Sequence, residues 1–243
     1  MPRFFMAGTN IMGGMAIMTG RDAEHVRVLR LRPGEDMVIC DGQGTDYKCR
    51  FVRADKERVE AEVIEVVKCP AEPTVKATIL CGLPKGDKTD YIIQKCVETG
   101  ADEIVFFHSN RCIAKIDTPQ KKLERWQRIA EEAAKQSGRG IIPQIKWAGE
   151  YADALDIAVK KDLALFMYET GERDALNTVL EGNKDIKTIA IITGPEGGFA
   201  PFEADLARIT GLKICSMGER ILRCETAPVV ALTAAMYATG NLS

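Results

Sequence analysis

The residues with the clearest chemical potential are three glycines and a proline in the segment TIAIITGPEGGF, residues 188–199. An apolar, β-branched run leads directly into this loop, which is therefore expected at the end of a buried strand. Glycine has no Cβ, so Gly194, Gly197 and Gly198 would let backbone amides approach a bound molecule closely. Pro195 removes one amide and stiffens the turn. The pattern indicates a ligand-binding wall, although a turn of this composition serves structure alone equally often.

A second glycine-containing loop follows another expected strand, within CSMGERILRCETAPVV at 215–230. Gly218 marks its turn, Glu225 or Thr226 is a candidate helix cap, and Pro228 falls in the first turn of the following helix. Ligands of parallel α/β folds bind outside the carboxyl ends of strands. We therefore expect the two loops to form opposite walls of one pocket.

Two other glycine patterns fit phosphate binding poorly. GLPKGDKT at 82–89 follows a strand, but it has three residues between its glycines instead of the four of a P-loop, and Asp87 occupies the lysine position. A carboxylate there would repel phosphate. DGQGTDY at 41–47 has Tyr47 where a dinucleotide loop places its third glycine. Neither segment favours a nucleotide site.

The paired loops resemble a known family. GPEGGF, followed about twenty residues later by MGERILRCETA, resembles the bacterial 16S ribosomal RNA uracil-N3 methyltransferases of the SPOUT superfamily. Three further segments look like other parts of that family: HVRVLRLRPGEDMVICDGQG, LPKGDKTDYIIQKCVETGADEI and EEAAKQSGRGIIPQI. The resemblance implies a PUA-like RNA-binding barrel, a C-terminal α/β domain with a deep trefoil knot, bound S-adenosylmethionine and a homodimer.

The resemblance also implies the residues of the cofactor site. Two loops and the end of the strand LALFMYE would supply its walls: Gly194, Pro195, Glu196, Gly197, Gly198, Met217, Gly218, Ile221, Leu222, Arg223, Thr226, Ala227, Tyr168 and Glu169. Met217 departs from the leucine that the family usually has, but the two side chains are apolar and similar in volume. By position and type, Arg223 is a candidate to stabilise a developing uracil oxygen, and Glu225 to accept the N3 proton.

The spacing of apolar residues predicts two domains. In residues 1–72, alternating runs at 25–31, 36–42, 47–54 and 58–67 are separated by turn signals, as in a small antiparallel barrel. A proline-containing stretch at 68–74 then serves as a linker. Residues 73–243 alternate apolar strands with helical patterns, including a long helix at 118–137 and a last one from about 226. This second part is expected to be α/β, with a mostly parallel sheet covered on both faces.

Charge is distributed unevenly along a chain whose net charge is only -2. Residues 111–139 hold eight lysines or arginines against four acids, a local charge of +4, and most of the basic residues share one face of the long helix. A solvated helix face is the plain explanation, but the resemblance favours contact with RNA phosphates. The predicted RNA-binding residues are Lys85, Lys88, Lys95, Arg111, Lys121, Arg125, Arg128, Gln136 and Arg139.

The remaining features narrow the protein class. Eight cysteines without a C-x-x-C pair favour reduced, buried thiols over a zinc site or a disulfide framework, so we expect no metal and a cytoplasmic location. No stretch matches a membrane helix. The last helix, rich in alanine, is expected either in the core or at the homodimer interface. The expected partner is 16S ribosomal RNA within the small ribosomal subunit. The rival hypotheses are a SPOUT enzyme with a ribose or transfer-RNA target and an inactive RNA-binding assembly protein.

Overall fold

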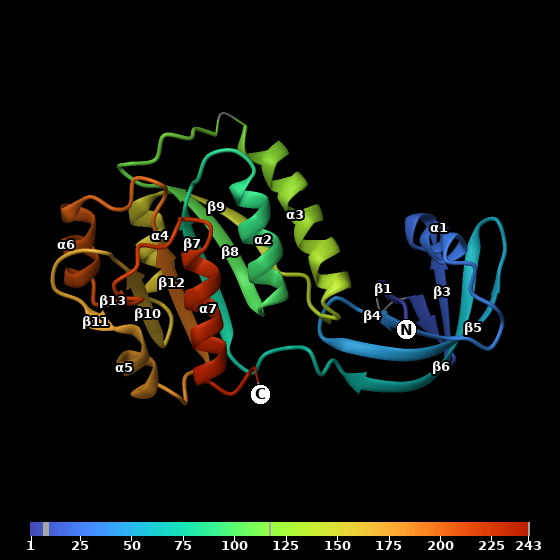
Figure 1. Ribbon diagram of the computed structural model, residues 1–243. Helices are drawn as coiled ribbons and strands as arrows, with labels where there is room; N and C mark the ends of the chain where they lie inside the picture. Colours follow the sequence, from blue (N-terminus) through green and yellow to red (C-terminus); the bar gives the residue numbers. More distant parts are fainter. Residues whose placement is uncertain (7–9, 117, 243) are drawn as a thin grey trace. The chain divides into compact units, whose positions relative to one another are not determined.

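The structure, a computed structural model, describes residues 1–6, 10–116 and 118–242, without the side chains of residues 21, 22 and 25 (Figure 1). The chain divides into two compact units. The first comprises Met1–Glu72 and Ala134–Ile142, and the second comprises Pro73–Ala133 and Pro143–Ser243. We expected a division at residue 72; the structure adds the distant segment 134–142 to the first unit.

The first unit is built on a six-stranded sheet in the order β1-β4-β5-β6-β3-β2. The pair β1–β4 is parallel and the other pairs are antiparallel. Its elements are β1 (Arg3–Phe5), β2 (Ile11–Met12), β3 (Met15–Thr19), α1 (Gly20–Val28), β4 (Asp36–Cys40), β5 (Thr45–Ala54) and β6 (Arg58–Lys68). The strands predicted at 36–42, 47–54 and 58–67 are therefore confirmed, and their alternating apolar side chains bury one face of the sheet around Phe4, Met37 and Phe51.

The predicted strand at 25–31 is wrong. Residues up to Val28 belong to α1, and the rest of the segment is a turn and loop. Ala23 and Val26, three residues apart, are both buried against the sheet, whereas Val28 is 76% exposed. The apolar spacing thus follows the helix period, and the alternation of valine and arginine was too short to distinguish the two periods.

The second unit is a seven-stranded sheet in the order β11-β13-β10-β12-β7-β8-β9, in which every pair is parallel. Its strands are β7 (Lys76–Gly82), β8 (Ala101–His108), β9 (Gln144–Glu150), β10 (Leu163–Met167), β11 (Asp174–Ala175), β12 (Thr188–Thr193) and β13 (Lys213–Ser216). Its helices are α2 (Lys88–Glu98), α3 (Pro119–Gln136), α4 (Tyr151–Ala158), α5 (Leu176–Glu181), α6 (Pro201–Ile209) and α7 (Ala227–Ala238). The predicted α/β class with a parallel sheet is confirmed.

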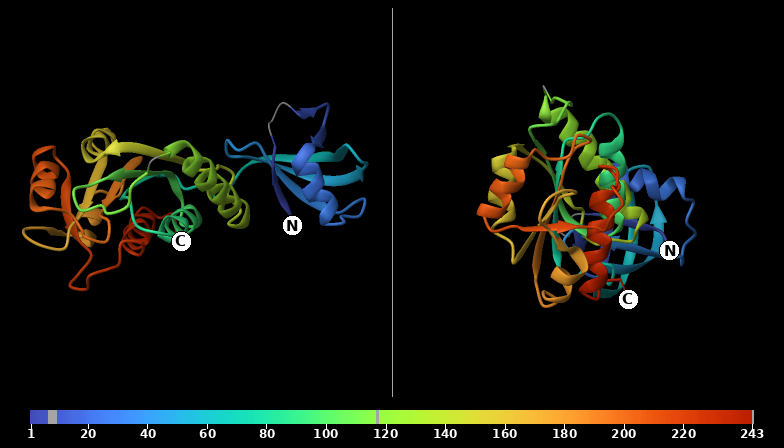
Figure 2. Two further views of the ribbon diagram at one scale, coloured as in Figure 1. Left: turned by 90° about the horizontal axis from the view of Figure 1, so that it is seen from above. Right: turned by 60° about the vertical axis from the view of Figure 1, so that its left-hand side comes forward.

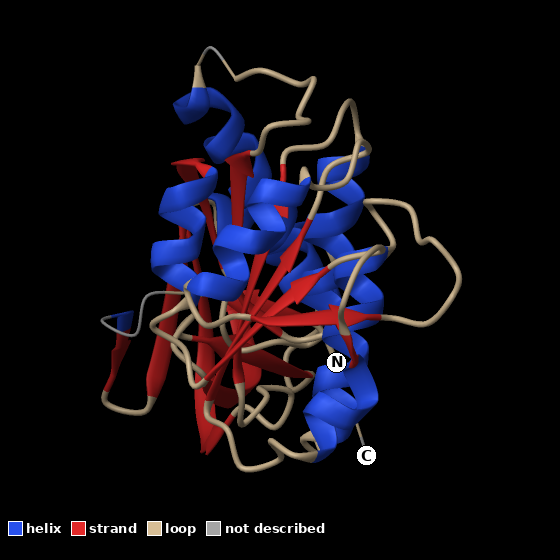
Figure 3. Ribbon diagram, turned by 90° about the vertical axis from the view of Figure 1, so that its left-hand side faces the viewer, coloured by secondary structure: helices blue, strands red, loops and turns tan. Residues whose placement is uncertain are grey.

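Helices cover both faces of this sheet (Figures 2 and 3). Helices α2 and α7 contact each other and pack on one face, over β7, β8 and β12. Helices α4 and α6 pack on the opposite face, where Tyr151, Phe166 and Phe199 belong to one buried apolar cluster. The β-branched and aromatic strand residues are thus buried on both sides, as expected for parallel strands.

The strand order brings distant loops together. Strand β10 lies between β13 and β12, so the carboxyl ends of three strands that are well separated in sequence are neighbours. The next strand, β7, ends at Gly82, where an added Cβ would lie 2.6 Å from Cδ of Pro195. This contact requires glycine at the end of β7 and seats the loop after β12 directly against it.

The described part of the chain holds neither a candidate membrane span nor a candidate metal site. No helix there is both long and apolar enough to span a membrane. No group of three or more histidine, cysteine or acidic residues is arranged to hold a metal ion within the same described residues, and the side chain of His25 lies outside them.

Candidate functional site

A cavity of about 520 Å³ lies at the carboxyl ends of β10, β12 and β13. Its walls come from residues 167–173, from the loop after β12 and from the loop after β13, with Lys88 of α2 beside them. The volume lies within the range of about 300–1,000 Å³ that is usual for small-molecule sites. The parallel sheet therefore places a ligand-sized cavity where such folds bind their ligands.

Most of the predicted cofactor residues line this cavity. Twelve of the fourteen are in its walls: Tyr168, Glu169, Gly194, Pro195, Glu196, Gly198, Met217, Gly218, Ile221, Leu222, Arg223 and Ala227. Gly197 and Thr226 are the two that are not among its lining residues. The structure adds Arg173, Glu219 and Arg220, which sequence reasoning missed because charged residues in exposed loops carry no distinctive pattern.

Each glycine of the loop after β12 has different surroundings. An added Cβ on Gly194 would lie 3.2 Å from the backbone of Gly198, so the loop folds closely on itself. Gly198 has φ of +63°, and its Cβ would lie 2.5 Å from Oε1 of Glu169 in the cavity. Gly197 points elsewhere, since its Cβ would lie 3.0 Å from Cβ of Arg111. Only part of this bare loop therefore faces the cavity.

The outer side of the same loop is fixed by the segment after β8. Arg111 Nη1 donates a hydrogen bond to the carbonyl oxygen of Gly197 at 3.0 Å. Glu203 of α6 is 1% exposed, and its carboxylate accepts hydrogen bonds from the backbone N–H groups of Asn110 at 2.9 Å and Ala200 at 2.7 Å. Sequence reasoning missed Glu203, whose only signal is its place three residues after Ala200, the residue that precedes α6.

A cluster of charges lies at the cavity mouth. Lys88 Nζ is 2.9 Å from Oε1 of Glu196 and 3.6 Å from Oε2 of Glu225. Burial acts to raise the pKa of Glu225, but hydrogen bonds from its backbone and from Cys224, with the nearby Lys88 charge, outweigh it and lower the pKa below its ordinary value of 4.5. Burial raises the pKa of the Cys224 thiol to about 12, so the thiol remains protonated and donates to Glu225 Oε2 at 3.2 Å.

The lining fits S-adenosylmethionine by its chemistry. Apolar side chains such as Met217 and Leu222 suit a purine ring, and the close approach allowed at Gly194 and Gly198 suits a flat ligand against backbone. Carboxylates and guanidinium groups in the same walls match a ligand with both an ammonium and a carboxylate: Glu169, Glu219, Arg173 and Arg220. The residues that line the cavity therefore fit S-adenosylmethionine.

The predicted RNA-binding residues have different surroundings. Lys121, Arg128 and Gln136 are exposed on α3, and Lys85 and Arg111 are exposed in loops. Arg125, also exposed, forms an ion pair with Asp90 of α2, and Lys95 forms one with Glu98. Lys88 lines the cavity instead of an outer surface.

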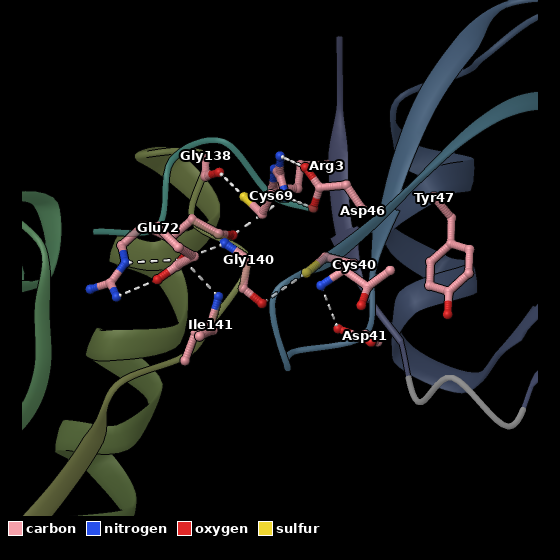
Figure 4. Close-up of polar contacts among 12 residues, drawn as sticks. Arg3, Cys40, Asp41, Asp46, Tyr47, Cys69, Glu72, Gly138, Gly140 and Ile141 are labelled. Atoms are coloured by element: carbon pink, nitrogen blue, oxygen red, sulfur yellow. Dashed lines mark hydrogen bonds and ion pairs between the residues drawn. The ribbon is translucent and has the colours of Figure 1, made fainter. Parts of the chain in front are cut away.

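Arg139 does not lie on the basic face of α3, and this prediction is wrong. Helix α3 ends at Gln136, and Arg139 belongs to the segment that joins the first unit. Its side chain is 3% exposed and pairs at 2.8 Å with Glu72, whose surroundings are shown in Figure 4. The periodicity was extended one turn too far, because Gly138, with φ of +75°, follows the end of the helix.

Family comparisons agree with the sequence resemblance. The family profile for an RNA methyltransferase domain matches residues 70–236, and the profile for an RNA methyltransferase PUA domain matches residues 18–64. The chain is similar to the ribosomal RNA small subunit methyltransferase E of Bacillus subtilis, with 36% identity over 91% of this chain and 90% of the relative. The protein of that name from Synechocystis sp. is 33% identical over 95% of this chain and 75% of its own.

Solved structures are similar over nearly the whole chain. A ribosomal RNA small subunit methyltransferase E from Neisseria gonorrhoeae, bound to S-adenosyl methionine, aligns with a TM-score of 0.86 and 32% identity, covering 98% of this chain and 97% of that one. A methyltransferase from Legionella pneumophila in complex with the same cofactor aligns with a TM-score of 0.81 and 27% identity, covering 97% of both chains. The protein therefore belongs to the RNA methyltransferase family that includes the ribosomal RNA small subunit methyltransferases E.

Proposed function

We propose that the protein transfers a methyl group from S-adenosylmethionine to N3 of a specific uridine in 16S ribosomal RNA. The observation that carries the proposal is that both glycine loops expected from the resemblance meet in one cavity, at the carboxyl ends of β10, β12 and β13. The family relationship supports the same activity.

The main task of the loops is alignment. The cofactor, when bound, supplies a methyl group on a sulfonium. The loop backbone at Gly194 and Gly198 holds one reactant against a rigid wall, and Pro195 is fixed by its contact with Gly82. Holding two reactants in an in-line geometry can lower a barrier by about 7–11 kcal/mol, so positioning can supply much of the rate.

The uridine demands a separate step, because N3 carries a proton and lies on the Watson–Crick edge. The target must be unpaired or turned out of its stack. Arg223, whose side chain is 85% exposed beside the cavity, is available to stabilise the developing oxygen charge. Glu225 has a lowered pKa and is therefore ionised at neutral pH, the form that accepts a proton.

RNA recognition is assigned to exposed side chains of the second unit and to the first unit. The exposed residues Lys121, Arg128 and Gln136 of α3, with Lys85 and Arg111 near the cavity, supply phosphate contacts in the second unit. The first unit, which carries the PUA match, supplies further RNA contacts. In this proposal the expected domain 73–243 carries out methyl transfer, and both it and the expected domain 1–72 contact RNA.

The wider setting is part of the same proposal. We assign the reaction to the cytoplasm, on the small ribosomal subunit, with the expected trefoil knot holding the cofactor loops.

The exposed face of α7, where Val230 is 39% and Tyr237 is 75% exposed, supplies a homodimer interface. Analytical ultracentrifugation of Tyr237→Arg tests this interface: the variant should sediment as a monomer, and an unchanged dimer would remove α7 from it.

The decisive experiment follows the methyl group. Labelled S-adenosylmethionine is incubated with small ribosomal subunits that lack the modification, in parallel with protein-free 16S RNA, and the nucleosides are then analysed. Label in 3-methyluridine supports the proposal, and the preferred substrate shows when in assembly the enzyme acts. Label in a ribose-methylated nucleoside or only in transfer RNA would instead identify a different target, and no label despite cofactor binding would contradict the 16S assignment.

The proton step is tested by Glu225→Gln. The variant should lower kcat with little change in cofactor affinity, since the amide has a similar shape but cannot accept the proton. Turnover equal to that of the unsubstituted protein at several pH values would exclude Glu225 as the base.

A further inference from the structure

Lys88 occupies an unusual place for a predicted RNA contact. It is the first residue of α2, yet its ammonium lies 2.9 Å from Oε1 of Glu196 in the loop after β12. The same ammonium is 3.6 Å from Oε2 of Glu225 and 3.7 Å from Sγ of Cys224, both in the segment after β13. One side chain, 33% exposed, therefore reaches both walls of the cavity.

This contact connects two otherwise separate walls. Among the hydrogen bonds and ion pairs seen in the described residues, none joins residues 194–199 directly to residues 217–227. The segment 85–88, which leads into α2, makes the connection, since the backbone N–H of Lys85 also donates to Oε1 of Glu196, at 3.0 Å. Lys85 and Lys88 thus hold the first loop by two donors, and the Lys88 ammonium also holds the second loop.

The charges around Lys88 explain why an ammonium is needed there. Glu196 and Glu225, with exposed side-chain fractions of 29% and 17%, face the same ammonium from two loops. A second cation, Arg223, has its Nη1 4.0 Å from Oε1 of Glu225, but its side chain is 85% exposed. Without Lys88, two partly buried carboxylates would share one cavity mouth and repel each other.

We propose that Lys88 is a positioning residue of the cofactor site, which sets the spacing of the two loops and holds the Glu225 carboxylate in place. The effect of Lys88 on cofactor binding is argued from the geometry of the cavity alone. Its effect on turnover, through Glu225, rests on the proposed function. An RNA-contact role makes the opposite prediction, because it leaves cofactor affinity unchanged and reduces the salt dependence of RNA binding.

The test compares the binding of S-adenosylhomocysteine, by calorimetry, to the unsubstituted protein, Lys88→Met, Lys88→Arg and Lys146→Met. Lys146 is a matched control, because it is also a lysine paired with a glutamate, Glu103, but does not line the cavity. Lys88→Met should bind about tenfold more weakly, the scale of losing two partly exposed ion pairs. Lys88→Arg should recover most of the affinity, since a guanidinium can bridge two carboxylates, and Lys146→Met should bind normally.

A double-mutant cycle separates positioning from a general loss of structure. If Lys88 acts through Glu196, then Glu196→Gln should weaken binding much less in the Lys88→Met background than in the unsubstituted protein. Fully additive effects would overturn the proposal, as would a Lys88→Met variant that binds S-adenosylhomocysteine normally. Thermal unfolding of each variant checks that the fold is retained, and Lys88→Arg keeps the test valid if Lys88→Met fails to fold.

Failure of the two proposals gives different results. If no 16S RNA is methylated but the affinities follow the expected order, the target assignment fails and the role of Lys88 stands. If methylation occurs at the uridine while Lys88→Met binds the ligand normally, the role of Lys88 fails and the proposed function stands.

Discussion

Each unit contains a cluster of paired cations and carboxylates, and the two clusters differ in how deeply they are buried. In the first unit, Arg139 and Glu72 have side chains that are 3% and 8% exposed. In the second unit, the side chains of Lys88, Glu196 and Glu225 are 33%, 29% and 17% exposed at the mouth of a cavity. Both cations were predicted to bind RNA, and neither lies on an open surface.

Glu72 and Arg139 form the buried cluster, in which protein groups supply the hydrogen bonds to the Glu72 carboxylate (Figure 4). Glu72 accepts hydrogen bonds from Arg139 Nη2 at 2.8 Å and from the backbone N–H groups of Gly140 at 2.7 Å and Ile141 at 2.9 Å. Gly140 has no room for a side chain, since a Cβ would lie 2.5 Å from Cβ of Cys69. These contacts attach segment 134–142 to the rest of the first unit.

The open cluster, Lys88 with Glu196 and Glu225, differs because its carboxylates share a single ammonium. Lys88 is shared between two carboxylates from separate loops, and the cluster borders the cavity. The comparison distinguishes a buried ion pair that joins two segments of the first unit from a shared, partly exposed cluster beside the cavity that fits the cofactor. Removing one partner of a buried pair costs about 3–5 kcal/mol, but an exposed pair contributes only about 0–1 kcal/mol.

The largest effect is expected from Glu72→Gln. It removes the carboxylate charge that pairs with the buried Arg139 guanidinium, so the free energy of unfolding should fall by about 3–5 kcal/mol, as measured by urea denaturation. Glu65→Gln is the control, because Glu65 pairs with Lys48 but the two side chains are 54% and 50% exposed. A Glu72 variant as stable as the control would break the distinction between the clusters.

Gly198→Ala should affect the cavity more than Gly197→Ala. At Gly198 the added methyl meets a carboxylate inside the cavity and a φ of +63°, so ligand affinity should fall at least about tenfold. At Gly197 the methyl meets Arg111 outside the cavity, and a smaller loss is expected. Gly211→Ala, with φ of +92° and open space, controls for backbone strain alone. Calorimetry measures the affinity of all three variants for S-adenosylhomocysteine. Equal affinities would show that Gly198 does not form the cavity wall.

Glu203→Gln should destabilise the second unit moderately. The buried carboxylate accepts two backbone hydrogen bonds, and the amide offers only one acceptor oxygen, so the loss should be about 1–3 kcal/mol. Asp205→Asn, an exposed position on the same helix, serves as the control. Thermal unfolding provides the measurement. No difference between the two variants would show that this link does not stabilise the loop after β12.

The open cluster should be sensitive to acid. Burial acts to raise the pKa of Glu196, but hydrogen bonds from Lys88 and Lys85 outweigh it and lower the pKa below 4.5. A carboxyl whose folded-state pKa is depressed stabilises the fold above its unfolded value and loses this contribution as pH falls. The stability difference between the unsubstituted protein and Glu196→Gln should therefore be constant from about pH 7 to 5 and shrink below about pH 4.5. A difference that does not change with pH would contradict the ion pair.

The smallest effects are expected on α3. Arg125 is compensated by Asp90, whereas no ion pair is seen for Arg128 among the described residues. Arg128→Gln should therefore reduce the slope of log K against log salt for 16S RNA by about one, and Arg125→Gln by less. Equal slopes for both variants and the unsubstituted protein would show that the basic face of α3 is exposed to solvent and does not contact RNA.

The sequence by itself determined the local features of this protein. The α/β class, the long basic helix and both glycine loops follow from periodicity and residue type, which act over a few residues. The resemblance added twelve residues that line the cavity, because loop sequences that bind one ligand are constrained at each position. The alternation at 25–31 misled only because helix and strand periods are indistinguishable over so short a run.

Only the tertiary structure decided which partner each polar side chain meets. Glu72 and Arg139 are 67 residues apart, and Lys88 and Glu196 are 108 residues apart. The same is true of the strand order, in which β10 lies between β12 and β13, and of Gly197, which is bare because Arg111 packs against it. The physical reason is that long-range pairing depends on how the whole chain folds back on itself, and no local pattern of residues records it.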